Sequence, residues 1–372
     1  MVLPTLAGSP HDSTSFDRRE FVKICSMAAA AVGLPAEAAA RFVENAEQGL
    51  KPSVIWLSNQ ECTGCTESLL RTSHPRLDEL ILDLISLDYH EALQVAAGHQ
   101  AEEARLAAME RHKGSYICVI EGAIPTKDDG IYCKIAGKTS IELVREVAAD
   151  AGAIIAIGSC ASWGGIPSAS PNPTGAAGAP EVLPDHTVVT IPGCPSNPYN
   201  FLGVALQFAT FGTLPELDAL GRPKFAYGRT IHEHCPRRAH FDAGRFVKQF
   251  GDEGHRQGWC LYQMGCKGPV THANCSTLHY GEMNVWPIGI GHPCFGCTEE
   301  GVGFTLALHD TVEPARITPP ATYPPIFAQR EGPNPWATMA LGAVVGGAIG
   351  GGIIAAKKVS QPCEDDVSGE EG

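Results

Sequence analysis

The chain has 372 residues, a net charge of −14 and a pI near 5.4, and 14 of its residues are cysteine. The acidic balance argues against nucleic-acid binding, which requires a basic surface. The cysteines are too dilute for a small disulfide scaffold, and the length allows two domains with a sizeable core.

The first 48 residues resemble a twin-arginine export signal. Arg18 and Arg19 precede a mildly apolar, alanine-rich run at residues 24–34, and small residues follow. An ordinary amphipathic helix is the alternative. Because such signals export proteins that are already folded, we expect any cofactor to be inserted in the cytoplasm.

Residues 49–215 have the alternating pattern of an α/β domain. Four short apolar runs have the composition of strands that are covered on both faces. These runs are residues 53–57, 116–120, 153–157 and 187–191. Helical patterns occupy residues 140–151 and 197–211. Strands and helices in alternation predict a doubly wound parallel sheet.

Four cysteines follow the ends of these strands. Cys62 and Cys65 come after the first run, Cys160 after the third and Cys194 after the fourth. Because the carboxyl ends of parallel strands meet at one edge of the sheet, we expect the four thiols to lie together. Four thiolates in a small volume need a positive centre, which an iron–sulfur cluster or zinc supplies. Disulfides are the alternative.

A second group of potential ligands falls within residues 216–328. Its members are His232, Cys235, Cys260, Cys266, Cys275, Cys294 and Cys297. Seven ligands suit neither a set of disulfides nor one metal ion. The first four could hold a four-iron cluster with an imidazole at one iron, and the last three could hold a three-iron cluster. Spacing alone leaves this division open.

The C-terminal part contains a candidate membrane anchor. Residues 337–356 carry no charge, and at about 1.5 Å per residue a helix of this length spans a bilayer. Lys357 and Lys358 follow it and favour the cytoplasmic side, which places the globular part outside. We predict a transmembrane anchor at residues 336–358 and an acidic tail at residues 359–372. A glycine-rich disordered tail is the alternative.

Several motifs resemble those of the small subunit of membrane-bound [NiFe]-hydrogenases. They are ECTGCTES, EGAIPTKDDGIYC, GSCASWGGIPSASPNPTGA, IPGCPSNP, IHEHCPRR and GHPCFGC. The resemblance covers roughly residues 15–358. It implies a flavodoxin-like domain with one cluster, followed by a loop-rich domain with two. It also implies a heterodimer in which the large subunit holds the nickel–iron centre and this chain transfers electrons to a membrane b-type cytochrome or a related quinone-reducing module.

The resemblance also implies a ligand set for each cluster. The proximal [4Fe–4S] cluster is expected on Cys62, Cys65, Cys160 and Cys194. The distal [4Fe–4S] cluster is expected on His232, Cys235, Cys260 and Cys266. The medial [3Fe–4S] cluster is expected on Cys275, Cys294 and Cys297.

Three positions refine this expectation. Oxygen-tolerant relatives carry two extra cysteines around the proximal cluster, where this chain has Gly64 and Gly165. We therefore expect an ordinary, oxygen-sensitive proximal cluster. Pro287 stands where relatives with a four-iron medial cluster place a fourth cysteine, which favours three irons here.

Other residues have less specific roles. Cys118 and Cys133 are expected to be structural thiols. Glu61 and Glu121, both near the expected proximal cluster, could relay protons or bond to the partner subunit, or have no special role. Arg237 and Arg238 could steer an acidic acceptor, and a solvated charge pair is the alternative. No complete phosphate-binding motif occurs, so nucleotide binding is unsupported.

Two competing functions are an iron–sulfur subunit of another exported oxidoreductase and a non-enzymatic surface protein held by disulfides. The His232-x2-Cys235 spacing favours hydrogenase, because generic ferredoxin-type subunits bunch their cysteines in repeated C-x2-C runs. A disulfide-held protein would be colourless. Two four-iron clusters and one three-iron cluster predict a brown protein with about eleven irons per chain.

Overall fold

The computed structural model describes residue 41 and residues 51–72, 85–280 and 285–314. The chain divides into a unit of residues 1–324 and a unit of residues 325–372, and every described residue belongs to the first. The expected anchor and acidic tail lie outside the described residues, as does the expected export signal apart from residue 41. Within the described ranges, no helix is long and apolar enough to cross a membrane.

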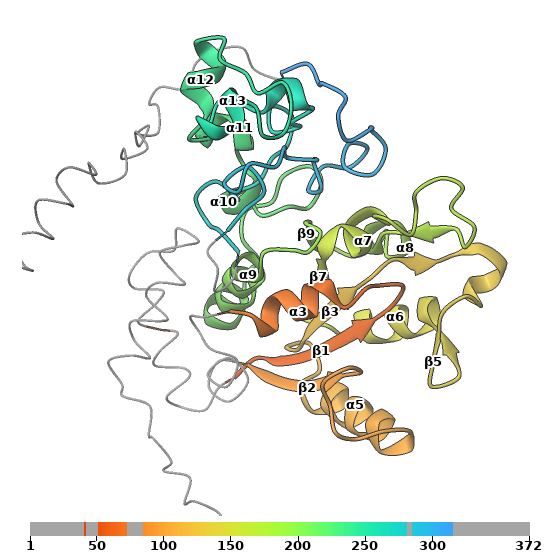
Figure 1. The fold of residues 1–372 in the computed structure, drawn as a ribbon. Coiled ribbons are helices and arrows are strands. Elements are labelled where there is room, and N and C mark those ends of the chain that lie inside the picture. Colours follow the sequence, from red (N-terminus) through yellow and green to blue (C-terminus); the bar gives the residue numbers. More distant parts are fainter. Residues whose placement is uncertain (1–40, 42–50, 73–84, 281–284, 315–372) are drawn as a thin grey trace, which may run out of the picture. The chain divides into compact units, whose positions relative to one another are not determined.

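A five-stranded parallel sheet organises the N-terminal part (Figure 1). Its strands are β1 (Ser53–Ser58), β2 (Ser86–His90), β3 (Ile117–Glu121), β7 (Ala153–Ile157) and β9 (Val188–Ile191). They pair in the order β2-β1-β3-β7-β9, which is the 2-1-3-4-5 order of flavodoxin-like sheets. The four expected strands are confirmed. Sequence reasoning missed β2, because this edge strand, SLDYH, is too polar to form an apolar run.

Helices cover both faces of the sheet. On one face, α3 (Gly64–Leu70) and α9 (Pro198–Phe211) pack against the side chains of Val54 and Trp56. On the other face, α5 (His99–Arg111) and α6 (Ser140–Ala148) pack against Ile55 and Leu57. Neighbouring residues of β1 therefore point into opposite layers, as expected for a sheet that is buried on both sides.

Shorter elements complete the unit. Two small antiparallel pairs join β4 (Ile124–Pro125) to β8 (Ala176–Ala177) and β5 (Lys134–Ile135) to β6 (Lys138–Thr139). The short helices are η2 (Lys127–Gly130), α7 (Gly158–Trp163), α8 (Ala179–Val182), α10 (Lys224–Tyr227), α11 (Ile231–His234), α12 (Arg238–Asp242), α13 (Glu253–Arg256) and η3 (Tyr262–Met264).

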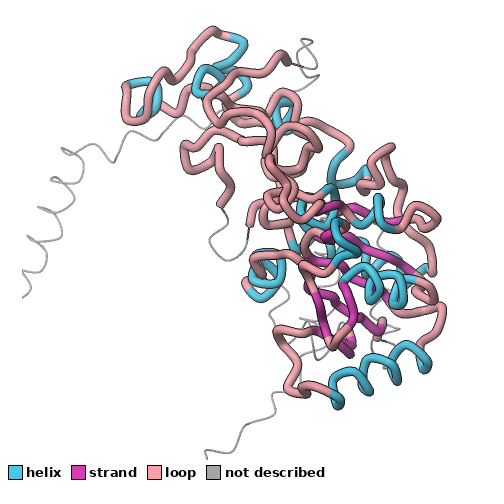
Figure 2. Tube along the Cα trace, turned by 90° about the vertical axis from the view of Figure 1, so that its right-hand side faces the viewer, coloured by secondary structure: helices cyan, strands magenta, loops and turns pink. Residues whose placement is uncertain are grey.

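After α9 the chain consists mostly of loops and single-turn helices (Figure 2). One hydrophobic cluster continues from the sheet into these loops, where it includes Ile231, Trp286 and Ile288. The side-chain amides of Asn200 and Asn274 also bond to each other in both directions, at 3.2 and 2.8 Å. Burial and hydrogen bonds therefore fix the cysteine-bearing loops, which have little regular structure of their own.

Candidate metal centres

The first four predicted ligands meet at the carboxyl edge of the sheet. Cys62 lies in the turn between β1 and α3, and Cys65 lies in the first turn of α3. The helix α7 starts directly after β7 and carries Cys160, and Cys194 follows β9. Burial raises the pKa of both Cys65 and Cys160; negative charge on Cys160 or Cys194 raises that of Cys65 further, and charge on Cys194 or Cys62 raises that of Cys160 further. The four thiols are therefore close enough to repel one another as anions.

Two glycines make room for these thiols. Gly158 has a φ of +83°, and a Cβ there would lie 2.5 Å from the Sγ of Cys65. Gly165 has a φ of +51°, and a Cβ there would lie 2.9 Å from the Sγ of Cys160. Both positions combine a left-handed backbone with close approach to a sulfur, so a larger residue would be strained at either. A cysteine in place of Gly165 would crowd Cys160.

A buried carboxylate orients the first pair of thiols. Glu121 ends β3 and is only 2% exposed. Its Oε1 accepts bonds from the backbone N–H groups of Cys65 and Thr66 at 3.0 and 3.2 Å. Its Oε2 accepts bonds from Trp56 Nε1 at 3.0 Å and Thr66 Oγ1 at 2.5 Å. Glu121 therefore caps the first turn of α3, which carries Cys65. Burial and the charge of Glu121 raise the pKa of neighbouring Glu61 to about 7.

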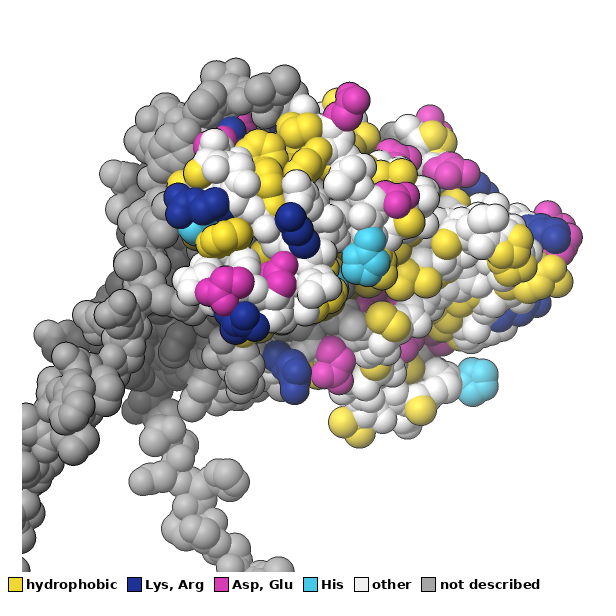
Figure 3. Space-filling model, turned by 45° about the horizontal axis from the view of Figure 1, so that its top comes forward, with side chains coloured by type: hydrophobic (Ala, Val, Ile, Leu, Met, Phe, Trp, Pro, Cys, Tyr) yellow, Lys and Arg dark blue, Asp and Glu magenta, His cyan; other side chains and the backbone are white. Residues whose placement is uncertain are grey.

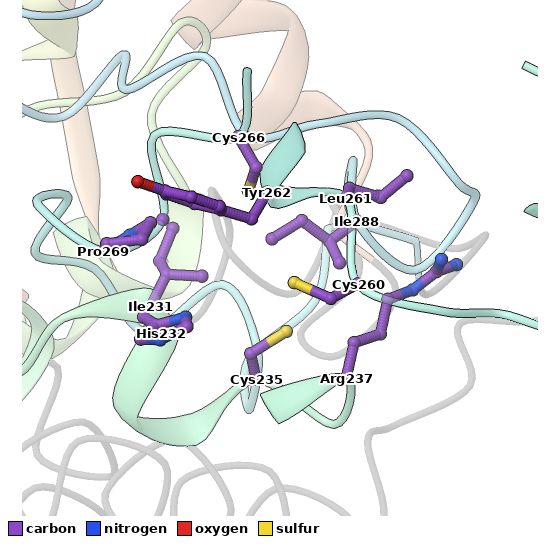
Figure 4. Close-up of a pocket in the computed structure, with 11 residues that line it drawn as sticks. Ile231, His232, Cys235, Arg237, Cys260, Leu261, Tyr262, Cys266, Pro269 and Ile288 are labelled. Carbon is purple, nitrogen blue, oxygen red and sulfur yellow. The ribbon is translucent and has the colours of Figure 1, made fainter. Parts of the chain in front are cut away.

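The first four ligands of the second group line a cavity in the loop-rich part (Figure 4). Its lining includes His232, Cys235, Cys260 and Cys266. Burial raises the pKa of both Cys235 and Cys260 to about 12, whereas burial and the charge of Arg238 lower that of His232 to about 4. The imidazole is therefore neutral, and its buried Nε2 has no hydrogen-bond partner. A metal ligand must be a neutral imidazole with a free nitrogen, so this donor set fits an iron–sulfur cluster.

The two arginines beside this cavity are not a solvated pair. Arg238 is 2% exposed, and its Nε donates to both carboxylate oxygens of Asp242 at 3.1 and 3.2 Å. Arg237 lines the cavity and donates to the carbonyl of Trp259 at 2.9 Å. The solvated alternative is wrong for Arg238, since the fold packs its guanidinium over the ring of Phe241.

On the face in Figure 3, basic and acidic side chains are interspersed, without a field of one sign.

The remaining three cysteines line a cavity of about 440 Å³. Cys275, Cys294 and Cys297 contribute to this lining together with Pro287, which offers no donor atom. Burial raises the pKa of the Cys297 thiol to about 12. Cys194 of the proximal set also lines this cavity, so the three cysteines match a three-iron cluster once Cys194 is assigned to the first site.

The three sites follow one another through the protein. Cys194 lines the same cavity as Cys297, and Ile231 and Ile288 line both this cavity and the one that holds His232. Ser159, next to Cys160, donates its hydroxyl to the carbonyl of Cys297. Short links of this kind suit electron transfer, because tunnelling becomes steeply slower with distance.

The described cysteines, twelve in number, are all free thiols. Cys118 is wholly buried in β3, as expected of a structural thiol, and Cys133 is partly buried. Within the described ranges, no three His, Cys, Asp or Glu side chains are arranged to hold a single metal ion.

Sequence reasoning missed several residues that support these sites. Ser159 bridges two of the ligand loops, and Lys267 is buried between two others. Arg222 is buried and donates to Asp218 at 2.7 Å and to Glu299 at 2.9 Å. The only sequence signal was adjacency, since Ser159 precedes Cys160 and Lys267 follows Cys266.

Two family models match the chain. The model of the NADH ubiquinone oxidoreductase 20 kDa subunit matches residues 62–208. The model of the C-terminal part of the NiFe/NiFeSe hydrogenase small subunit matches residues 227–309. These matches correspond to the sheet and to the loop-rich part.

Individual relatives agree with the models. The hydrogenase-2 small chain of Escherichia coli K12 is 50% identical over 363 residues, 97% of each chain. The quinone-reactive Ni/Fe-hydrogenase small chain of Wolinella succinogenes is 46% identical over 290 residues, 77% of this chain and 82% of that one. A crystal structure of the reduced, active NiFeSe hydrogenase from Desulfomicrobium baculatum aligns with a TM-score of 0.62 and 35% identity, covering 67% of this chain and 94% of that one. From its sequence, its fold and its three gathered donor sets, this chain belongs to the small-subunit family of [NiFe]-hydrogenases.

Proposed function

We propose that this chain conducts electrons through three iron–sulfur clusters between a nickel–iron site in a large subunit and an acceptor at a membrane. Family membership makes the chain an electron-transferring subunit of a hydrogenase. The finer proposal concerns which clusters it holds and where its electrons go. Bound iron–sulfur clusters supply one-electron transfer over short hops.

The proposed ligands are the three donor sets around the three sites. The proximal [4Fe–4S] set is Cys62, Cys65, Cys160 and Cys194. The distal [4Fe–4S] set is His232, Cys235, Cys260 and Cys266. The medial [3Fe–4S] set is Cys275, Cys294 and Cys297. The observation that supports this division most strongly is the unpartnered, buried Nε2 of His232 in a cavity with three thiols.

The chain's own residues hold these donors in place. Glu121 fixes the turn that carries Cys65, and Ser159 ties the loop of Cys160 to that of Cys297. With Gly64 and Gly165 in place of extra cysteines, the proximal site offers four sulfurs and is proposed to be of the oxygen-sensitive kind.

The two terminal segments of the chain indicate where in the cell the protein is located. We propose a twin-arginine signal at residues 1–48, a flavodoxin-like domain at residues 49–215, a cluster-binding domain at residues 216–328 and an anchor at residues 336–358. The protein would then face the periplasm. The quinone-reactive relative supports an acceptor that reacts with quinone. We propose a membrane b-type cytochrome or a related quinone-reducing module in that role.

Copurification from membranes, with metal and sulfide analysis, tests the proposal. We expect about eleven irons per chain, with nickel only in the larger partner. His232→Ala should remove the distal cluster's paramagnetic signal and up to about four irons, while the signals of the other two clusters remain. His240→Ala is the matched control, because His240 lies on α12 and does not line the cavity. Absence of inorganic sulfide, or His232→Ala protein with wild-type iron content, would contradict the proposal.

A further inference from the structure

Lys267 is a buried cation between two of the proposed cluster sites. Its side chain is 0% exposed, and it directly follows Cys266 of the distal set. Its backbone N–H donates to the carbonyl of Cys294, in the medial set, at 2.6 Å. Building on the function proposed above, we propose that Lys267 is a fixed positive charge that the medial and distal clusters share and that raises the reduction potentials of both.

The surroundings of the Nζ atom require an ammonium group. Nζ donates to four backbone carbonyl oxygens. These are the oxygens of Gly265 at 2.9 Å, Ala307 at 2.8 Å, Leu308 at 3.2 Å and Asp310 at 2.6 Å. All four partners are acceptors, and an ammonium offers three N–H donors. A neutral amine would offer two N–H donors and would turn its lone pair toward a carbonyl oxygen. This cage of four carbonyl oxygens therefore stabilises the charged form of Lys267.

Lys267 differs from the other deeply buried cations of the described chain in its lack of an ion pair. Arg105, Arg222 and Arg238 each reach a carboxylate within 3.1 Å. Among the described residues, no carboxylate oxygen lies within salt-bridge distance of the Lys267 Nζ. The carbonyl dipoles solvate the charge without cancelling it, so its field extends to its surroundings.

The backbone of Lys267 adjoins one proposed ligand of each cluster, Cys266 in sequence and Cys294 through a hydrogen bond. Burial lowers the pKa of Lys267, and attraction by Asp310 and by thiolates at Cys266 and Cys294 opposes this shift. Reduction adds an electron to a cluster, and a nearby positive charge stabilises the added electron. Because Lys267 adjoins one ligand of each cluster, its charge favours the reduced form of both.

Redox titration of the purified, intact heterodimer, followed by electron paramagnetic resonance, tests this inference. Lys267→Met removes the charge and keeps the length of the side chain. At a fixed applied potential, the ratio of oxidised to reduced cluster should rise at least tenfold at both sites, a shift of about 59 mV for a one-electron couple. Lys267→Arg retains the charge and should restore most of the difference.

Lys113→Met is the matched control, because Lys113 is 61% exposed and pairs with Asp150 on the surface. It should leave both midpoints unchanged. If Lys267→Met protein assembles with full iron content and wild-type midpoints, the inference is wrong while the proposed cluster sites stand. A wild-type complex without cluster signals would instead refute the proposed function.

A second variant decides the matter if Lys267→Met protein does not assemble. Lys267→Gln removes the charge and keeps N–H donors for the carbonyl cage around the side chain. Both midpoints should then fall, and the distal and medial signals should move in the same direction. Unchanged midpoints in this variant would overturn the inference.

Discussion

Glu121→Gln gives a direct test of the buried cap at the proximal site. The two carboxylate oxygens of Glu121 accept bonds from four donors, two at each oxygen. Glutamine has nearly the same shape but only one acceptor oxygen. Whichever way the amide turns, two buried donors then face an NH₂ group and lose their partner.

The expected cost follows from these unpaired donors. Each buried donor without a partner costs about 1–3 kcal/mol, so the free energy of unfolding should fall by roughly 2–6 kcal/mol. For a domain of this size, 1 kcal/mol moves the melting temperature by about 2–4 °C. We therefore expect Glu121→Gln to unfold at least about 4 °C below the wild type and to lose iron from the proximal site first.

Anaerobic calorimetry of the purified complex, with iron analysis before and after heating, measures this effect. Glu142→Gln is the matched control, since Glu142 is an exposed carboxylate in the capping box of α6. Glutamine also serves in capping boxes, so this change should cost less than about 1 kcal/mol. If the two variants melt at the same temperature, the buried cap does not stabilise the site as reasoned here.

Three further predictions rest on individual contacts. Burial raises the pKa of Glu91 to about 7, above its value in the unfolded chain. The free energy of unfolding should therefore fall as the pH rises from about 4.5 to 7, because the buried carboxyl loses its proton over this range. Glu91→Gln should flatten this part of a profile of melting temperature against pH and, above pH 7, stabilise the chain by roughly 2–3 kcal/mol. Gly165→Ala should lower the iron content of the proximal site. At Gly137 an added Cβ would meet no atom within 4 Å, so Gly137→Ala should show only the conformational cost of the positive φ. Arg222→Met should lower the free energy of unfolding, measured by thermal unfolding, by about 3–5 kcal/mol, because it leaves the buried Glu299 carboxylate without its arginine partner. A smaller decrease would mean that His272 or water replaces the guanidinium.

Sequence pattern alone was enough to predict the α/β frame and the meeting of four thiols at one sheet edge, whereas the division of the later donors into two sets came from a family resemblance. Cys160 and Cys194 follow uninterrupted apolar runs, and the parallel topology that such runs require brings strand ends to one edge. These features are local in the chain, so spacing and periodicity reveal them. The edge strand β2 lacked such a run and was missed.

Tertiary packing determines which charged residues support the sites. Glu121 and the backbone N–H of Cys65 are 56 positions apart, and the most distant carbonyl around Lys267 is 43 positions downstream. Arg238 bonds to Asp242 on its own helix, a pairing that is local in sequence, but only the folded chain shows that its guanidinium is buried. The partners of Glu121 and Lys267 come from distant segments, so the roles of these two residues could be read only from the folded chain.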